Sequence, residues 1–276
     1  MVPQQDIIPG PPLRLVQLTD LHLLGDPAAR LRGVDTGATW RAVFGAARED
    51  LARADLLLLT GDLAEHGEAV AYARLSDDLE SVERGVRVRA IPGNHDDPAR
   101  LAEAFHATGE ARVMALSHGG WQVLLLDSSI PGQSAGHLDS NQLDWLDTRL
   151  AKAPERHVLV VLHHPPLPIT SPWLDAIALD NGAELNARLD RHANVRGVLF
   201  GHVHQAFEKR RRGVRYLATP STCVQFVPGT EQPEVDTLTP GWRTLALHPD
   251  GRIQTRIRRL PVSLPQELAT KRRRSR

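Results

Sequence analysis

The chain has 276 residues, a formal net charge of zero and one cysteine, Cys223. This length is sufficient for one large α/β domain with a buried core, and the neutral balance argues against a surface for long nucleic acids. A single cysteine excludes an intrachain disulfide and zinc sites built from several thiolates. There is no apolar run near the roughly 18 residues of a membrane helix and no secretory signal. We therefore expect a cytoplasmic protein.

Residues 1–12 are rich in proline and glycine, which predicts a flexible lead-in. The first predicted strand covers residues 14–18 and is followed by Asp20 and His22. A carboxylate and an imidazole two residues apart can both approach one metal ion where the chain turns. For this pair alone, a turn aspartate beside a surface histidine is the more common explanation. Residues 24–36 lack periodicity and predict a loop at the rim of the same edge.

The most informative stretch is residues 55–62, in which four leucines precede Thr60, Gly61 and Asp62. A short apolar run of this kind predicts a strand buried on both faces. Residues 40–51 have apolar side chains at helical spacing and predict a helix that covers the sheet. Because sites in α/β sheets form just outside the carboxyl ends of strands, we place Asp62 at the centre of such a site.

The next strand, predicted for residues 86–91, leads to Asn94 and His95. The amide oxygen of Asn94 can bind a metal ion without adding charge, whereas His95 is free to act on a substrate. The next two residues, Asp96 and Asp97, stand directly before a proline. For both aspartates we favour a structural role at the start of the next helix.

A buried strand predicted for residues 157–162 ends in His163 and His164. One histidine of this pair is expected to bind metal, and the other to support it or to serve the fold. By position, we assign the ligand role to His163. Residues 165–180 contain four prolines, which predicts a rigid, non-helical flap beside the site.

The last core strand, predicted for residues 195–200, delivers His202 and His204. Two imidazoles at this spacing can supply one ligand to each of two adjacent ions. The remainder, about residues 207–260, is predicted to be β-rich, including a strand over residues 223–227. We see no linker that would divide the chain.

The candidate ligands share one property: each follows the end of a predicted strand and offers nitrogen or oxygen. They are Asp20, His22, Asp62, Asn94, His163, His202 and His204. Such a set, without a thiolate, suits Mn, Fe or Zn better than Ca or Mg. Two ions about 3.5–4 Å apart are the usual device for phosphoester hydrolysis, and Asp62 can bridge them because a carboxylate has two oxygens. His95 is the candidate that protonates the leaving alkoxide.

The order of these elements resembles the calcineurin-like metallophosphoesterases. The resemblance is carried by Asp20-x-His22, Gly61-Asp62, Gly93-Asn94-His95, His163 and Gly201-His202-x-His204. It implies a four-layer αββα sandwich of two mixed β-sheets flanked by helices. It also implies that one ion is held by Asp20, His22, Asp62 and His204, and the other by Asp62, Asn94, His163 and His202. We expect a single domain over residues 13–262, followed by a basic, disordered tail over residues 263–276.

A narrower resemblance is to the bacterial class III 3′,5′-cyclic-AMP phosphodiesterases. It is carried above all by residues 218–226 (ATPSTCVQF) and residues 240–245 (PGWRTL). It implies hydrolysis of cyclic AMP to 5′-AMP by a hydroxide that bridges the two ions, with Asp62 and His95 as catalytic residues. The residues then expected to contact the substrate are His22, Asn94, His95 and His204.

The resemblance implies two divalent or mixed-valence ions, Fe or Mn, with Zn or Co as alternatives. The expected partner is a small cyclic nucleotide, with no nucleic-acid polymer and no membrane, and the protein is a monomer or a homodimer. Two alternatives stay open: a broader metallophosphoesterase for 2′,3′-cyclic nucleotides or other small phosphodiesters, and a non-catalytic scaffold of the same fold. The scaffold is disfavoured because all seven ligands and His95 are present.

Overall fold

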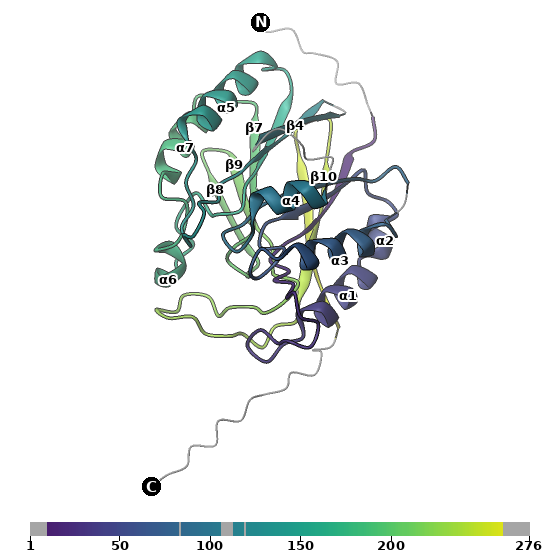
Figure 1. Ribbon diagram of the computed structural model, residues 1–276. Helices are drawn as coiled ribbons and strands as arrows, with labels where there is room; N and C mark the ends of the chain where they lie inside the picture. The colour runs from purple at the N-terminus through teal and green to yellow at the C-terminus, as the bar shows by residue number, and fades with distance from the viewer. Residues whose placement is uncertain (1–9, 83, 106–112, 119, 262–276) are drawn as a thin grey trace, which may run out of the picture.

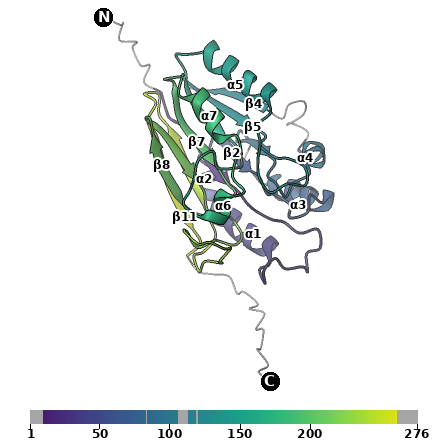
Figure 2. The ribbon, with the colours of Figure 1, turned by 90° about the vertical axis from the view of Figure 1, so that its left-hand side faces the viewer.

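The computed structural model describes residues 10–82, 84–105, 113–118 and 120–261. Two mixed β-sheets stack face to face, and helices cover their outer faces (Figures 1 and 2). The predicted four-layer αββα sandwich is therefore confirmed. The expected tail and residues 1–9 of the lead-in lie outside the described residues.

The first sheet has the strand order β11-β10-β1-β2-β3. Its strands are β1 (Leu13–Leu18), β2 (Leu56–Thr60), β3 (Arg87–Ile91), β10 (Gly241–Leu247) and β11 (Ile253–Arg259). The strands β1, β2 and β3 are mutually parallel, whereas β10 and β11 run antiparallel to their neighbours. The three parallel strands thus end at one edge of the sheet.

The second sheet has the order β4-β5-β6-β7-β9-β8, and its four central strands are parallel. Its strands are β4 (Val113–His118), β5 (Trp121–Leu126), β6 (His157–Val161), β7 (Val195–Phe200), β8 (Phe207–Arg211) and β9 (Val214–Ala218). Ion-binding loops were predicted after β6 and β7, which are neighbours here.

Helices cover each sheet on its outer side. The first sheet packs against α1 (Thr36–Ala46), α2 (Arg48–Leu51), α3 (Ala69–Leu79) and α4 (Pro98–Ala104). The second sheet packs against α5 (Ser140–Lys152), α6 (Pro172–Asp175) and α7 (Gly182–Leu189). Within the described part of the chain, no helix combines the length and the apolar character that crossing a membrane requires.

The leucines of β2 show why this sequence forms the inner layer of a sandwich. Successive side chains of a strand point to opposite faces. Leu57 and Leu59 accordingly join the cluster under the helices, and Leu56 and Leu58 join the cluster between the two sheets. All four are fully buried, so β2 is held rigidly on both faces up to the point where it delivers Asp62.

Three local expectations differ from the structure. The helix predicted for residues 40–51 is two helices, α1 and α2, which meet at Ala47. The flap at residues 165–180 is not entirely non-helical, because α6 begins at Pro172, where a missing N–H is tolerated in the first turn. Residues 223–227 form no strand; the segment makes one isolated bridge, Phe226 with Val235, and Phe226 N donates to the loop that carries His204.

Candidate metal centre

The loops that follow β1, β2, β3, β6 and β7 meet at one edge of the sandwich and bring all seven predicted ligands together. Within the first sheet, His22 N donates to Asp62 O at 2.8 Å. Between the sheets, His202 N donates to Asp20 Oδ1 at 3.0 Å. The parallel direction of the strands explains this convergence, because their carboxyl ends lie on the same edge.

Most of the candidate ligands have a left-handed backbone. Eight non-glycine residues of the described part have positive φ, and five of them are Asp20 (54°), His22 (49°), Asp62 (52°), His202 (68°) and His204 (51°). This conformation costs about 1–2 kcal/mol for an ordinary residue and persists only where the surroundings impose it. Here it turns the chain sharply after each strand and holds the side chain at the sheet edge.

The first group of ligands consists of Asp20, His22, Asp62 and His204, each at most 5% exposed. One ligand atom from each lies within 4.8 Å of the others. His204 Nε2 is 3.4 Å from Asp20 Oδ1, and His22 Nε2 is 3.7 Å from Asp62 Oδ2. Two carboxylates and two imidazoles that converge in this way can bind a transition metal ion.

The second group shares Asp62 with the first. His163 Nε2 is 3.3 Å from Asp62 Oδ2, and His202 Nδ1 is 3.0 Å from Asn94 Oδ1. His163 Nε2 is buried and makes no hydrogen bond within the described residues. Because an unpaired buried polar atom is costly, a metal ion at this position fits the residues present. The His/Asp cluster is thus able to bind metal, and its shared carboxylate fits two adjacent ions.

The pKa shifts indicate an ionised Asp62 and a neutral His202, as metal ligands must be, and a His163 that carries a proton before metal binds. Burial alone would raise the pKa of Asp62, but His163 and other nearby imidazoles hold it well below the usual value. Burial opposes protonation of His163, yet the Asp62 carboxylate outweighs it and raises the pKa of His163 to about 9. Burial and the neighbouring histidines keep the pKa of His202 well below its usual value. An arriving metal ion would displace the proton from His163.

Three of the four candidate histidine ligands are oriented through Nδ1. The partners are Glu65 Oε2 for His22 (2.6 Å), Thr60 O for His163 (2.8 Å) and Val224 O for His204 (2.8 Å). Metal-binding histidines generally use their second ring nitrogen in this way, which fixes the tautomer. In each of the three, Nε2 is left for the ion.

Glu65 is a residue that the sequence analysis missed. Its carboxylate binds His22 and also lies 3.5 Å from His95 Nδ1, which is 3.0 Å from the Glu65 carbonyl oxygen. The His95 side chain is 37% exposed, in contrast to the four buried histidine ligands, so it can meet a substrate. The spacing Asp62-x-x-Glu65 after a buried strand was the available signal, but only the folded loop shows that Glu65 reaches two histidines.

Replacement of Glu65 by glutamine should weaken both of these contacts without changing the side-chain size. A partner that orients metal ligands is typically worth 10–100-fold in metal affinity or activity, so we expect a loss of roughly that size in Glu65→Gln. Metal titration and turnover measurements would test it. The matched control is Glu103→Gln, at an exposed position of α4, and equal behaviour of the two variants would contradict the orienting role.

The two aspartates after His95 have different roles. Asp97 accepts hydrogen bonds from Ala99 N and Arg100 N as the N-cap of α4, as predicted. Asp96 does not cap the helix: its half-buried carboxylate accepts hydrogen bonds from the backbone of the loops after β2 and β3 and from Tyr72 Oη. The helix-start interpretation of Asp96 was wrong because these longer-range donors cannot be seen in the local pattern.

A buried network of polar side chains joins the strand ends that carry the ligand loops. Gln17 Nε2 donates to Thr60 Oγ1 at 2.8 Å and to Phe200 O at 3.2 Å. Thr219 Oγ1 donates to Gln17, and Arg243 Nε donates to Thr219 Oγ1 at 3.1 Å. These bonds join strand ends of both sheets, including Thr60, whose carbonyl orients His163. The network therefore fixes the distance between the sheets where the ligands lie.

Gly93 allows the second group of ligands to approach closely. A Cβ atom at position 93 would collide with the carboxylate and backbone nitrogen of Asp62 and lie 2.8 Å from His163 Nε2. We expect Gly93→Ala to lose bound metal and to lower the unfolding free energy by about 1–3 kcal/mol, as overpacking does. Metal analysis and thermal unfolding would test this.

The control for Gly93→Ala is Gly45→Ala in α1. Nothing lies within 4 Å of a Cβ atom at position 45, and alanine is favoured over glycine in a helix by about 1 kcal/mol. This variant should keep its metal and be slightly more stable. Full metal retention by Gly93→Ala would show that the loops are less tightly packed than the structure indicates.

The chain is similar in sequence to several known proteins. A model of the calcineurin-like phosphoesterase family matches residues 13–206. The chain is 42% identical to the 3′,5′-cyclic adenosine monophosphate phosphodiesterase CpdA of Escherichia coli, over 90% of each chain. It is 41% identical to CpdA of Pseudomonas aeruginosa, over 89% of each. It is 39% identical to a 3′,5′-cyclic-nucleotide phosphodiesterase of a Nostoc species, over 93% of this chain and 96% of the relative.

Solved structures show the same fold at much lower identity. A dimetal phosphatase from Danio rerio superimposes with a TM-score of 0.66 at 16% identity, and the alignment covers 91% of this chain and 97% of that one. At this identity the likeness bears on the fold alone.

Proposed function

This chain belongs to the calcineurin-like phosphoesterase family, and we propose that it is a metal-dependent phosphodiesterase that hydrolyses 3′,5′-cyclic AMP to 5′-AMP. The relatives that carry this activity in their names match the chain over about nine-tenths of its length. The observation that supports the proposal most directly is Asp62, whose Oδ2 lies 3.3 Å from His163 and 3.7 Å from His22. One carboxylate thus faces both groups of ligands.

We assign the two groups to two ions. Asp20, His22, Asp62 and His204 would hold the first, and Asp62, Asn94, His163 and His202 the second. When bound, such a pair of ions activates water and neutralises charge on a phosphate diester. Fe or Mn suits these nitrogen and oxygen ligands, and Zn or Co can also be accommodated.

His95 is the proposed acid for the leaving group. Its Nδ1 is 3.0 Å from the carbonyl oxygen of Glu65, which leaves Nε2 to hold a proton for the departing ribose oxygen. Its backbone nitrogen donates to Asp62 Oδ1 at 3.0 Å, so the loop that carries His95 is fixed to the central carboxylate. We propose that His22, Asn94, His95 and His204 contact the phosphate.

The remaining features of the proposal concern the protein as a whole. We propose a single catalytic domain over residues 13–262 that acts in the cytoplasm as a monomer or a homodimer. A formal net charge of zero supports a small cyclic nucleotide rather than a nucleic-acid polymer as the substrate.

A substrate panel on protein stripped of metal and reloaded with Mn or Fe tests this function. The panel consists of cyclic AMP, cyclic GMP, 2′,3′-cyclic AMP and a nitrophenyl diester. We expect the highest kcat/KM for cyclic AMP, no activity after chelation, and recovery when metal is restored. A higher kcat/KM for 2′,3′-cyclic AMP would favour the broader phosphoesterase, and full activity without metal would contradict the proposal.

A further inference from the structure

His202 differs from the other three candidate histidine ligands. In His22, His163 and His204, the Nδ1 atom has a hydrogen-bond partner and Nε2 faces the site. In His202 the arrangement is reversed, because Nδ1 is 3.0 Å from Asn94 Oδ1. Since Asn94 and His202 belong to the same group of ligands, these two atoms would meet at one ion. His202 should therefore bind metal through Nδ1 and carry its proton on Nε2.

This proton needs an acceptor. His202 is only 5% exposed, and its Nε2 is buried without a hydrogen-bond partner among the described residues. A buried N–H without an acceptor costs about 1–3 kcal/mol, and a histidine held on one side only would be free to rotate away from its ion.

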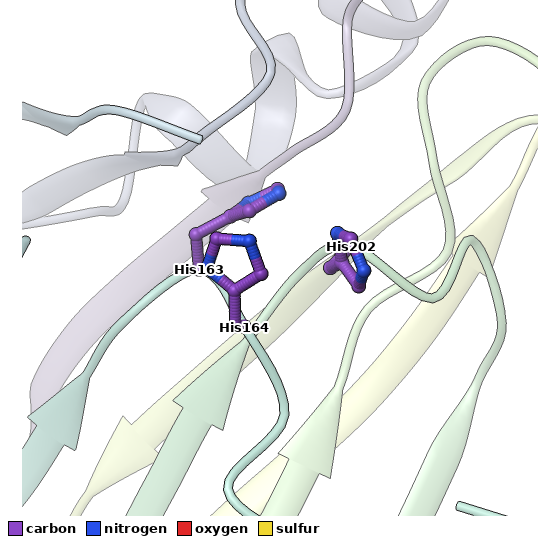
Figure 3. Close-up of side chains that lie close together, drawn as sticks. All are labelled: His163, His164 and His202. Carbon is purple, nitrogen blue, oxygen red and sulfur yellow. The ribbon is translucent and has the colours of Figure 1, made fainter. Parts of the chain in front are cut away.

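His164 lies next to His202 and has the complementary requirement. Its side chain is fully buried, its Nε2 is also unpartnered within the described part of the chain, and its Nδ1 is 2.8 Å from Ser128 Oγ. The ring centroids of His164 and His202 are 4.7 Å apart. Figure 3 shows His163 and His164 leaving the same strand end, with His202 opposite them.

We propose that His164 is a positioning residue for the second metal ion. It accepts the Nε2 proton of His202 through one bridging water and donates its own Nδ1 proton to Ser128 Oγ. The two rings are close enough for such a bridge, because their centroids are 4.7 Å apart and one water spans up to about 5.6 Å with two ordinary hydrogen bonds. The chain Ser128–His164–His202 then does for His202 what Glu65, Thr60 and Val224 do for the other ligands.

The competing arrangement is His164 as a direct metal ligand, since His163, His164 and His202 could themselves surround an ion. The hydrogen bond between His164 Nδ1 and Ser128 does not distinguish the two arrangements, because a His164 that binds metal through Nε2 would also keep this bond. The position of Asn94 distinguishes them, because it places the ion on the Nδ1 side of His202. The inference rests on the metal centre of the proposed function.

Nitrogen NMR of the zinc-loaded, ¹⁵N-histidine-labelled wild-type protein tests the inference without any substitution of the site. The expected spectrum shows His202 bound to zinc through Nδ1 with a proton on Nε2, and His164 unbound with a proton on Nδ1. A zinc-bound nitrogen in His164, or zinc on Nε2 of His202, would overturn the proposal. Hydrolysis of cyclic AMP by the same sample is measured separately, so either result leaves the proposed function to its own test.

Two variants at position 164 measure how much His164 contributes to metal affinity. His164→Leu removes the acceptor, whereas His164→Gln places an amide oxygen near the former Nε2. In a zinc competition titration, we expect His164→Leu to bind one of the two ions 10–100-fold more weakly and the other normally. His164→Gln should recover much of that affinity, while the two metal-free variants unfold at similar temperatures.

The matched control for both is His137→Leu, at an exposed histidine paired with Asp180, which should bind both ions like the wild type. Equal affinity for both ions in His164→Leu would overturn the positioning role. So would an equal loss for both ions in the two variants at position 164, because that result indicates general damage to the fold.

Discussion

Asp62→Ala should bind less metal than any variant that alters a ligand of one ion, and its turnover should fall to the level of the metal-free protein. The reason is geometric: Asp62 Oδ2 faces His163 and His22 within 3.7 Å, and Oδ1 accepts a hydrogen bond from His95 N. Loss of this carboxylate removes negative charge from both ion positions and frees the loop of His95. The activity loss should exceed the 10²–10³-fold that removal of one electrostatic stabiliser typically costs.

The control for this prediction is His22→Ala, which removes a ligand from the first group only. Alanine at position 62 would also be strained, because φ there is 52° and aspartate and asparagine tolerate that region better. Asp62→Asn is therefore the second variant, since it keeps the shape and removes the charge. Metal analysis after gel filtration gives the number of ions per chain. Two ions retained in both Asp62 variants would show that this residue does not bridge.

The parts of the site that could be predicted were those governed by the position of strand ends. Buried strands in parallel sheets are short apolar runs with clear limits, and the residue that follows each run must emerge at the common edge. Asp62 after β2 and His202 after β7 are of this kind. Their convergence follows from topology, without knowledge of any side-chain conformation.

The parts that could not be predicted depend on how the loops fold back. Glu65 reaches His22 only because the loop after β2 turns at left-handed Asp62. Asp96 accepts hydrogen bonds from Gly93 N in its own loop and from Ala64 N in the loop after β2, which is distant in sequence, whereas the local pattern suggested a helix cap. Residues 223–227 have the composition of a strand, but their contacts with the ligand loops override that propensity.

The second large effect concerns His95, which lies beside the ligands and belongs to neither group. Its ring centroid is 4.9 Å from that of His22, and its side chain is partly exposed where a substrate would approach. An imidazole at this place can protonate the departing 3′-oxygen of the ribose. General acid catalysis typically contributes about 10²–10⁴-fold, and the contribution shrinks when the leaving group needs no proton.

We therefore expect His95→Ala to keep both metal ions and to lose about 10²–10⁴-fold in kcat for cyclic AMP, but clearly less for a nitrophenyl diester. Nitrophenolate leaves as a stable anion, whereas the 3′-alkoxide of cyclic AMP does not. If His95 only orients Asn94 or the phosphate, both substrates should suffer equally. The two kcat ratios, measured on samples of equal metal content, separate these roles. Equal losses would leave His95 as a positioning residue and would require another proton donor for the alkoxide.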